Sequence, residues 1–378
     1  MRRPIYLDYN ATTPVDPSVV DAMRPFWEEH FGNPSSEHAY GWAAEEAVEQ
    51  GRERVAEMIG CEARNVTFTS GATEAINLAI KGVAAADVGR NHVVTVATEH
   101  KAVLETCLSL EKAGHHLTVL GVDKNGLVDL EELREAVTEH TLLVAVMAVN
   151  SETGVIQPLR EIADIAHAAG ALMMTDATQA PGKMTVDVDA WGADLAAFSA
   201  HKLYGPKGVG ALYRRLRSPR VRLVPQMDGG GHEGGLRSGT PNVPAIVGMG
   251  AAADLVRSRK DALGRVESLR DRMESELLAR IEGAYVNGAG ARRVGNTISL
   301  TFPGTRMRDV FPRMRGIAAS TGSACQTTSV RPSHVLTAMG LPEDHAFSTV
   351  RLSLGRFTTE EEVETAIEEI VAAVEGAR

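Results

Sequence analysis

The first two-thirds of the chain alternates between short apolar runs and segments with helical spacing. The predicted strands are 65–69, 92–97, 142–149, 171–175, 195–199 and 209–213. One helix is predicted after the first strand because its apolar side chains recur at i, i+3, i+4 and i+7, namely Ile76, Ala79, Ile80 and Val83. Another, marked by Leu159 and Ile162, is expected to end at Gly170. Repeated strand–helix–strand units predict an α/β fold with a mostly parallel sheet covered by helices.

The pattern changes after about residue 252. A long charged helix is predicted over 252–281, a strand over 297–302, and a final helix after Thr359, where Glu362 completes a capping-box pattern. We therefore expect a large domain over 15–252 and a smaller α+β domain formed by 1–14 and 253–378.

Composition limits the classes of partner and the cellular compartment, but it does not indicate a reaction. The 378 residues include 39 Lys and Arg against 49 Asp and Glu, and no basic tract favours nucleic acid or an anionic membrane surface. No apolar run approaches the ~18 residues of a membrane span, and the N-terminus does not resemble a signal peptide. Cys61, Cys107 and Cys325 are far apart, which argues against a disulfide framework or a zinc site. These features predict a soluble, cytoplasmic protein of more than one domain, and no metal site is predicted.

Polar residues follow several of the predicted strands, where ligands bind in open α/β sheets. The turn Ser70-Gly71-Ala72-Thr73 could bind a phosphate at a helix N-terminus, or it could simply cap that helix. Asp176 could pair with a protonated ring nitrogen, or it could be a turn residue. Lys202 could form a Schiff base, or it could extend past a strand end into solvent.

Cys325 lies among small and polar residues, in Ser320-Thr321-Gly322-Ser323-Ala324-Cys325-Gln326. Such neighbours favour an accessible thiolate that acts as a nucleophile, although a lone cysteine is often a small buried apolar residue. Cys61 and Cys107 have helical surroundings and are interpreted as structural.

Taken together, these segments resemble the cysteine desulfurases of the NifS/IscS type, which belong to the class V aminotransferase superfamily. The resemblance covers essentially the whole chain. It rests on an ordered series: Tyr6-Leu7-Asp8-Tyr9-Asn10-Ala11-Thr12-Thr13-Pro14, Asn33-Pro34-Ser35-Ser36 with His38, Thr69-Ser70-Gly71-Ala72-Thr73-Glu74-Ala75, Thr98-Glu99-His100, Asp176-Ala177-Thr178-Gln179-Ala180, Ser199-Ala200-His201-Lys202, Arg237-Ser238-Gly239-Thr240-Pro241, Gly322-Ser323-Ala324-Cys325 and Arg351-Leu352-Ser353-Leu354-Gly355-Arg356.

The resemblance implies a fold type I enzyme that uses pyridoxal 5'-phosphate. Lys202 would form the Schiff base and move the Cα proton, and Asp176 would pair with the pyridine nitrogen. His100 would stack on the ring and act as a catalytic residue that shuttles protons. Gln179 would hydrogen-bond the ring oxygen, and Ala72 and Asn150 would also contact the cofactor. The phosphate would be held by Thr73, Ser199, His201 and, across a homodimer interface, Thr240. Arg351, helped by Asn33 and Asn150, would bind the substrate carboxylate.

The implied reaction takes sulfur from L-cysteine, releases L-alanine and leaves a persulfide on Cys325. The persulfide would pass to an acceptor such as an iron–sulfur scaffold or a tRNA-thiolation enzyme, and Cys325 could ligate a transferred cluster. Selenocysteine lyase and a class V aminotransferase without sulfur chemistry stay open as alternatives, and a catalytically silent scaffold would need broken catalytic positions.

Two positions and one segment depart from the family pattern. Ser151 stands where the family usually has Asn, Gly234 where it usually has Arg, and the residues after Cys325 differ from the commoner Thr-Ser-Ala. A match to G-x-G-x-x-G at 229–234 does not indicate a dinucleotide site, because no βαβ unit is predicted around it.

Overall fold

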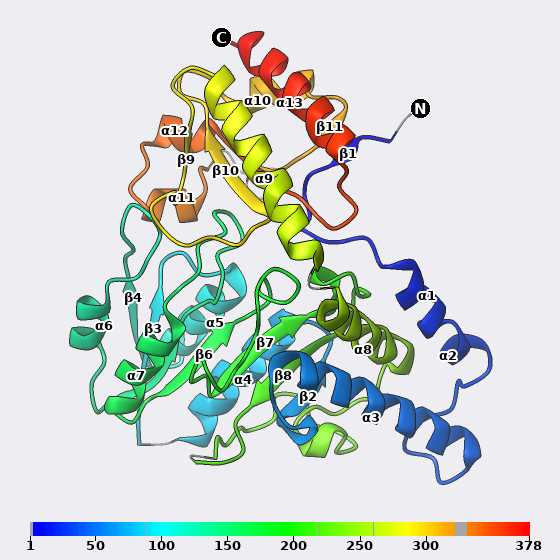
Figure 1. Cartoon of the computed structure of the whole chain (residues 1–378). Coiled ribbons are helices and arrows are strands. Elements are labelled where there is room, and N and C mark those ends of the chain that lie inside the picture. Colours follow the sequence, from blue (N-terminus) through cyan, green and yellow to red (C-terminus); the bar gives the residue numbers. More distant parts are fainter. Residues whose placement is uncertain (1–2, 88, 219, 260, 322–330) are drawn as a thin grey trace.

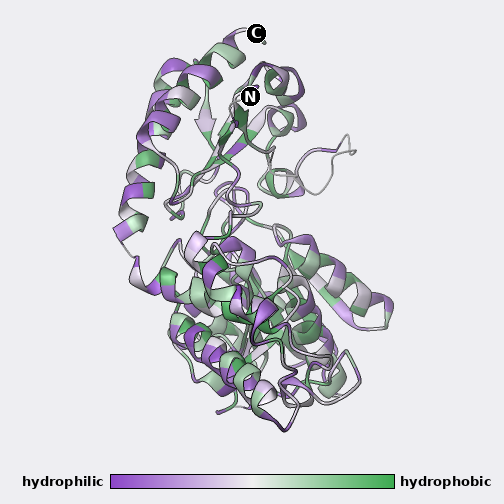
Figure 2. Ribbon diagram, turned by 90° about the vertical axis from the view of Figure 1, so that its right-hand side faces the viewer, coloured by the Kyte–Doolittle hydropathy of each residue, from purple (hydrophilic) through white to green (hydrophobic). Residues whose placement is uncertain are grey.

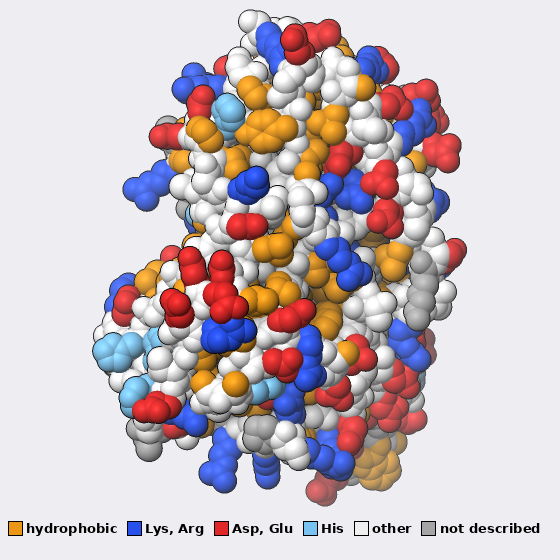
Figure 3. All heavy atoms as spheres, turned by 60° about the vertical axis from the view of Figure 1, so that its left-hand side comes forward, with side chains coloured by type: hydrophobic (Ala, Val, Ile, Leu, Met, Phe, Trp, Pro, Cys, Tyr) orange, Lys and Arg blue, Asp and Glu red, His pale blue; other side chains and the backbone are white. Residues whose placement is uncertain are grey.

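The computed structural model describes residues 3–87, 89–218, 220–259, 261–321 and 331–378. It has a larger lower part and a smaller upper part, and both termini lie in the upper part (Figure 1). The molecule is hollowed where the two parts meet, and acidic and basic side chains both occur across the face seen in Figure 3. Within the described residues, no helix is both long enough and apolar enough to cross a membrane.

The lower part is built on a sheet that has seven strands within the described residues, in the order β2-β8-β7-β6-β5-β3-β4. Only β8 runs antiparallel to its neighbours, so the predicted mostly parallel α/β sheet is confirmed. The strands are β2 Val66–Thr69, β3 His92–Val96, β4 His116–Leu120, β5 Thr141–Ala145, β6 Leu172–Asp176, β7 Leu195–Ser199 and β8 Gly210–Arg214.

Helices cover both faces of this sheet because successive strand side chains point to opposite sides. Met173 packs against one layer and its neighbour Met174 against the other. The first layer consists mainly of α1, α3, α6, α7 and α8, and the second of α4 and α5. The helices of this part are α1 Pro17–Met23, α2 Pro25–Glu28, α3 Ala39–Ile59, α4 Ala72–Ala86, α5 Lys101–Lys112, α6 Leu130–Ala136, α7 Leu159–Ala168 and α8 Val243–Ser258, with short 3₁₀ turns η1 Ala63–Asn65, η2 Ala200–Lys202 and η3 Glu233–Gly235.

The upper part has its own apolar cluster, between an antiparallel sheet and two long helices. The sheet order is β12-β10-β9, and a separate parallel pair joins β1 to β11. The long helices α9 and α13 carry hydrophobic and hydrophilic residues along their length (Figure 2), as helices with one buried face do. The elements are β1 Ile5–Tyr6, α9 Asp261–Arg280, β9 Tyr285–Val286, β10 Thr297–Thr301, α10 Met307–Val310, η4 Phe311–Arg313, β11 Ile317–Ala318, α11 His334–Ala338, α12 Glu343–Phe347, β12 Thr349–Ser353 and α13 Glu360–Glu375.

Several predicted strands differ from the structure by one residue at one or both ends, and two predicted elements differ by more. The strand expected over 142–149 ends at Ala145; the apolar run continues to Val149 as buried chain whose N–H groups at Val146 and Ala148 bond to carbonyls of Met174 and Asp176. The single helix expected over 252–281 is two helices, α8 and α9, with a non-helical residue at Arg259. The reason is packing: α8 belongs to the apolar cluster of the lower part and α9 to that of the upper part.

The apolar clusters change between Ala253 and Val266, and Leu7 packs in the upper cluster. The predicted domain division, 15–252 against 1–14 with 253–378, stays a prediction that this change in core supports. The capping box of α13 is confirmed: Thr359 accepts the N–H of Glu362, and Glu362 accepts the N–H of Thr359.

Candidate active site

Three of the predicted site residues follow the carboxyl ends of parallel strands. His100 comes after β3 and caps α5, Asp176 ends β6, and Lys202 lies in η2 directly after β7. The charge of Asp176 raises the pKa of His100, and the charge of Lys202 lowers it. Both charged groups therefore lie within electrostatic reach of His100. The enclosing protein has the largest effect and lowers that pKa, so His100 is held neutral. Its Nδ1 accepts the Ala102 N–H at 3.1 Å, which leaves the proton on Nε2.

The turn before α4 forms a close-packed cradle with β8. A Cβ on Gly210 would lie 2.6 Å from the Gly71 Cα, so only glycine permits this approach. The N-terminus of α4 has no side-chain cap, and its first turn contains Ala72 and Thr73. Ser199 Oγ lies 3.9 Å from the position of a Cβ on Gly71. Open backbone N–H groups beside a hydroxyl form a suitable donor set for a phosphate.

His201 lies at the same strand end and bonds through Nδ1 to Thr12 Oγ1 at 3.1 Å. Burial, followed by the positive charges of Lys202 and Lys207, lowers the pKa of His201 to about 4. A bound anion would offset these two cations, so this group also fits a phosphate site.

The N-terminal segment supplies partners that sequence reasoning assigned no role. The Lys202 amine donates to the backbone carbonyls of Asn10 and Ala11, at 2.6 and 2.7 Å. Gln179 Nε2 donates to the same Asn10 carbonyl at 3.0 Å, and its Oε1 contacts the amine of Lys183. Asn10 belongs to the opening motif at residues 6–14, and Lys183 lies four residues after Gln179. These positions were the only features of the sequence that could have indicated a role in the site.

Arg351 is 3% exposed and stands in the middle of β12. Its Nη2 pairs with Asp8 at 2.6 Å and its Nη1 donates to the Ser151 carbonyl at 3.2 Å. Its Nε is buried and has no hydrogen-bond partner among the described residues. A guanidinium with one unused N–H can donate to a second carboxylate without leaving Asp8.

Asn150 is buried and its amide is used within the protein. Its Oδ1 accepts the N–H groups of Glu152 and Thr153, and its Nδ2 donates to the Thr98 carbonyl at 3.1 Å. These bonds join the loops after β3 and β5. A contact from Asn150 to cofactor or substrate stays a prediction.

Among the described residues, Asn33 and Thr240 have no hydrogen bond to this group. Asn33 is exposed, and its Oδ1 accepts the N–H of Ser35 at 3.0 Å. Thr240 is exposed, just before α8, in a loop that Arg237 ties to Glu74 of α4 at 2.8 Å. Cys325, with the motif around it, lies outside the described residues.

Gly234 stands where the family usually has Arg. Its φ is +62°, a conformation in which arginine would be strained. The adjacent Glu233 pairs with Arg52 at 2.7 Å and accepts the N–H of Phe68 at 2.8 Å. The loop thus retains a firm contact with the sheet at β2.

Two buried acids anchor the start of α11 beside the site. Glu152 accepts Ser333 Oγ at 2.5 Å, and the Glu99 carbonyl bonds to His334 Nε2 at 2.9 Å. Burial raises the pKa of both carboxyl groups, and neighbouring Asp176 raises that of Glu99 further. The chain after residue 330 is therefore fixed to the loops that carry His100 and Asn150.

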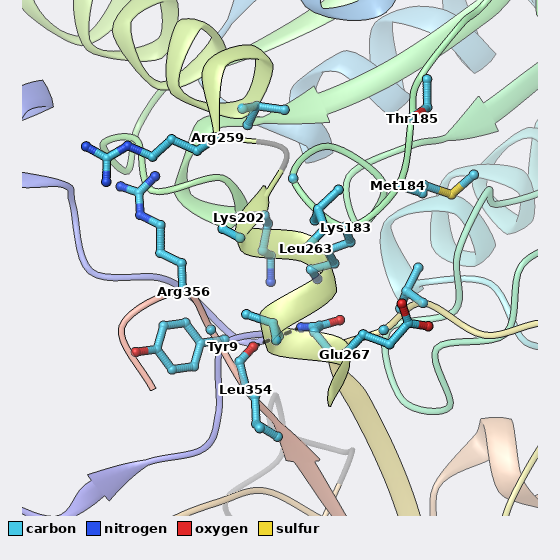
Figure 4. A pocket seen from close by; sticks show the side chains of 18 of the residues that line it. Tyr9, Lys183, Met184, Thr185, Lys202, Arg259, Leu263, Glu267, Leu354 and Arg356 are labelled. Carbon is cyan, nitrogen blue, oxygen red and sulfur yellow. Dashed lines mark hydrogen bonds between the residues drawn. The ribbon is translucent and has the colours of Figure 1, made fainter. Parts of the chain in front are cut away.

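A cavity of about 690 Å³ lies between the two parts and reaches Lys202 (Figure 4). Lys183 and Met184 line it from the lower part, and Glu267 and Leu354 from the upper part. His100 and Asp176 do not line this cavity. It therefore reaches Lys202 from a different side than these two residues do. Among the described residues, no cluster of three His, Cys, Asp or Glu side chains could hold a metal ion.

Comparisons with known proteins identify the family. The class-V aminotransferase family model matches residues 5–365. The cysteine desulfurase IscS of Anaeromyxobacter sp. (strain Fw109-5) is 50% identical over 377 residues, which cover 99% of this chain and 93% of that protein.

Two solved structures resemble the whole chain. A NifS-like protein has a TM-score of 0.91 and 37% identity, and the match covers 99% of this chain and 100% of that one. A structure described as SspA in complex with cysteine has a TM-score of 0.83 and 37% identity, over 94% and 99% of the two chains. The chain therefore belongs to the class-V aminotransferase family, and within it to the cysteine desulfurases.

Proposed function

We propose that this enzyme binds pyridoxal 5'-phosphate on Lys202, takes sulfur from L-cysteine, releases L-alanine and holds the sulfur as a persulfide on Cys325. The observation that carries the proposal is the convergence of Lys202, Asp176 and His100 at one sheet edge, next to the open N-terminus of α4. A lysine, a carboxylate, a ring and an anion cradle are the groups this cofactor needs.

Each side chain has a task that its position permits. Asp176 would face the ring nitrogen as a carboxylate, and His100 would cover the ring. The first turn of α4, with Ala72 and Thr73, would hold the phosphate together with Ser199 and His201. The cofactor, once bound, supplies an electron sink that makes the substrate Cα–H bond acidic.

The amine of Lys202 would take the Cα proton, which requires it to leave the carbonyls of Asn10 and Ala11. Arg351 would hold the substrate carboxylate through its unused Nε, with Asn33 and Asn150 completing the substrate site. Asp8 keeps Arg351 in place through its bond to Nη2.

Sulfur transfer would occur at Cys325. The thiolate would attack the substrate sulfur, breaking the bond between that sulfur and the substrate Cβ, and the carbon fragment would leave as alanine after protonation. Cys61 and Cys107 are poor candidates, because burial raises the pKa of each thiol to about 12.

The assembly and setting belong to the same proposal. We place the enzyme in the cytoplasm as a homodimer in which the exposed Thr240 reaches the phosphate of the partner subunit. An iron–sulfur scaffold or a tRNA-thiolation enzyme would accept the persulfide sulfur, and Cys325 could ligate a transferred cluster.

The test compares Cys325→Ser with Cys61→Ser, a matched cysteine replacement. Cys325→Ser is expected to keep the visible absorbance of the bound cofactor and to lose sulfide release from L-cysteine, whereas Cys61→Ser keeps both. Sulfide release that survives in Cys325→Ser would refute the persulfide role. Absence of any visible absorbance in the wild-type protein would refute the cofactor assignment.

A further inference from the structure

Lys183 is a second amine beside Lys202, and it takes no part in the proposed reaction. Its stem lines the cavity between the two parts, and its amine contacts Gln179 Oε1 and Asn10 Oδ1, the latter at 2.8 Å. Among the described residues, no carboxylate forms an ion pair with it. Burial, followed by the charges of Lys202 and Arg351, holds the pKa of Lys183 well below its usual value. In either protonation state the amine has at least two N–H donors, and here it faces two amide oxygens.

These contacts fix which way the Gln179 amide points. The amine of Lys183 is a donor, and in an amide only the oxygen can accept its N–H. Oε1 of Gln179 must therefore face Lys183, and Nε2 must point away. One N–H of Nε2 donates to the Asn10 carbonyl at 3.0 Å. The other N–H is left for an acceptor on the side away from Lys183.

Asn10 gives this arrangement a rigid support. The residue is 2% exposed, and its Nδ2 donates to Thr297 Oγ1 at 2.9 Å and to the Ser151 carbonyl at 3.0 Å. Asn296 Nδ2 donates to Asn10 Oδ1 at 3.1 Å, so both ends of the side-chain amide are held. The same residue contacts Gln179 and Lys202 through its backbone carbonyl and Lys183 through its side chain.

We propose that Lys183 is a positioning residue, which holds the Gln179 amide with its free N–H toward the phenolic oxygen of the cofactor. The inference rests on the proposed function, because it concerns how the site treats bound pyridoxal phosphate. An N–H donor there stabilises the phenolate and lowers the proton affinity of the neighbouring Schiff-base nitrogen. The reversed amide would place a carbonyl oxygen against the phenolate.

The test measures the pH midpoint of the visible absorbance of the bound cofactor. Lys183→Met and Gln179→Met are each expected to move this midpoint upward, because each removes or misdirects the N–H donor. Each is also expected to raise the dissociation constant for pyridoxal phosphate about fivefold, the effect of one net hydrogen bond. The double variant is expected to match Gln179→Met alone, since Lys183 acts through that amide. Additive shifts, or an unchanged midpoint in Lys183→Met, would overturn the inference.

Two further variants keep the test decisive. Lys183→Gln retains an N–H donor and is expected to lie closer to the wild-type midpoint; it also serves if Lys183→Met does not fold, as thermal unfolding of the cofactor-free proteins will show. A shift in Lys183→Gln as large as that in Gln179→Met would count against the inference. Arg259→Met removes a positive charge from the same cavity and is expected to leave the midpoint unchanged. If it shifts the midpoint as Lys183→Met does, cavity charge is responsible and the inference fails. Wild-type protein without visible absorbance would instead refute the proposed function.

Discussion

In the seven-stranded sheet, the side chains with proposed chemistry stand at or just beyond the end of a strand, whereas in the three-stranded sheet Arg351 stands in the middle of one. Beyond the ladder, the chain can turn and its N–H and C=O groups can face a ligand. A mid-strand residue has its backbone fixed on both sides: β10 pairs with Arg351 along one edge, and Ser320 bridges to it along the other. The first region can gather several groups, while the second holds one group rigidly.

The largest effect is expected at the strand end of the large sheet. Lys202→Ala should lower alanine formation from L-cysteine at least about 1,000-fold, because it removes both the Schiff-base amine and the proposed base. Lys207→Ala, an exposed lysine in the following turn, should leave most of the activity. Comparable loss in both variants would show that the local charge matters and not the position of Lys202.

The joint between the two regions should be the next most sensitive point. Arg356 pairs with Asp16, and its guanidinium lies 4.0 Å from the centre of the Tyr204 ring, with all three groups largely buried. Arg356→Ala should lower the free energy of unfolding by about 3 kcal/mol, because the buried Asp16 loses its partner. In urea unfolding, the exposed pair Arg272–Glu276 provides the control: Arg272→Ala should change stability by less than about 0.5 kcal/mol.

The rigid arginine of the small sheet should govern affinity for the substrate. Arg351→Lys keeps a positive charge but loses the fork of donors, so KM for L-cysteine should rise about tenfold or more with a smaller change in kcat. Steady-state assays check this, and Arg265→Lys, an arginine bonded only to the backbone carbonyls of Arg356 and Thr358 among described residues, should keep the wild-type KM. An equal loss in kcat would assign Arg351 to a later step.

The smallest effect concerns pH. The pKa of His201 is lowered to about 4, whereas an unfolded histidine has a pKa of about 6.5, so the unfolded chain binds more protons between these values. His201 therefore contributes stability above about pH 6.5 that is lost as the pH falls toward 4. In cofactor-free protein, His201→Asn should reduce the loss of unfolding free energy between pH 7 and pH 5. The exposed His140→Asn should retain the wild-type slope, and equal slopes in all three proteins would contradict the prediction.

Elements were predicted correctly where neighbouring residues alone indicate the structure, and they were missed where packing decides it. The strand at 195–199 was predicted with its observed bounds because an apolar run stops at a polar cluster, and Asp176 and Lys202 followed from such ends. The edge strand β4 was missed because its side chains are largely half-buried or exposed and show no clear alternation. The break at Arg259 was missed because both flanking segments are helical, and only packing against different cores separates them.

The unpredicted parts of the site are long-range contacts. Asn10 meets Lys183 and Lys202 across more than 170 residues, and no local pattern indicates such a pairing. Arg351 did carry a local signal, a charge within the apolar strand of Val350 and Leu352, but its role was inferred from the family resemblance. Asp8 as its partner became visible only in the folded chain.

The position of Asn10 also bears on how the enzyme is made. Its N–H donates to Ser353 Oγ at 2.9 Å, across 343 positions, and the Leu7 carbonyl accepts the N–H of Ser353. During synthesis Asn10 must wait until Ser353 has left the ribosome before it gains this partner. Because Asn10 in turn orients Lys202 and Gln179, we expect a nascent chain to fold its large sheet early and to capture cofactor only after the segment around Ser353 has been made.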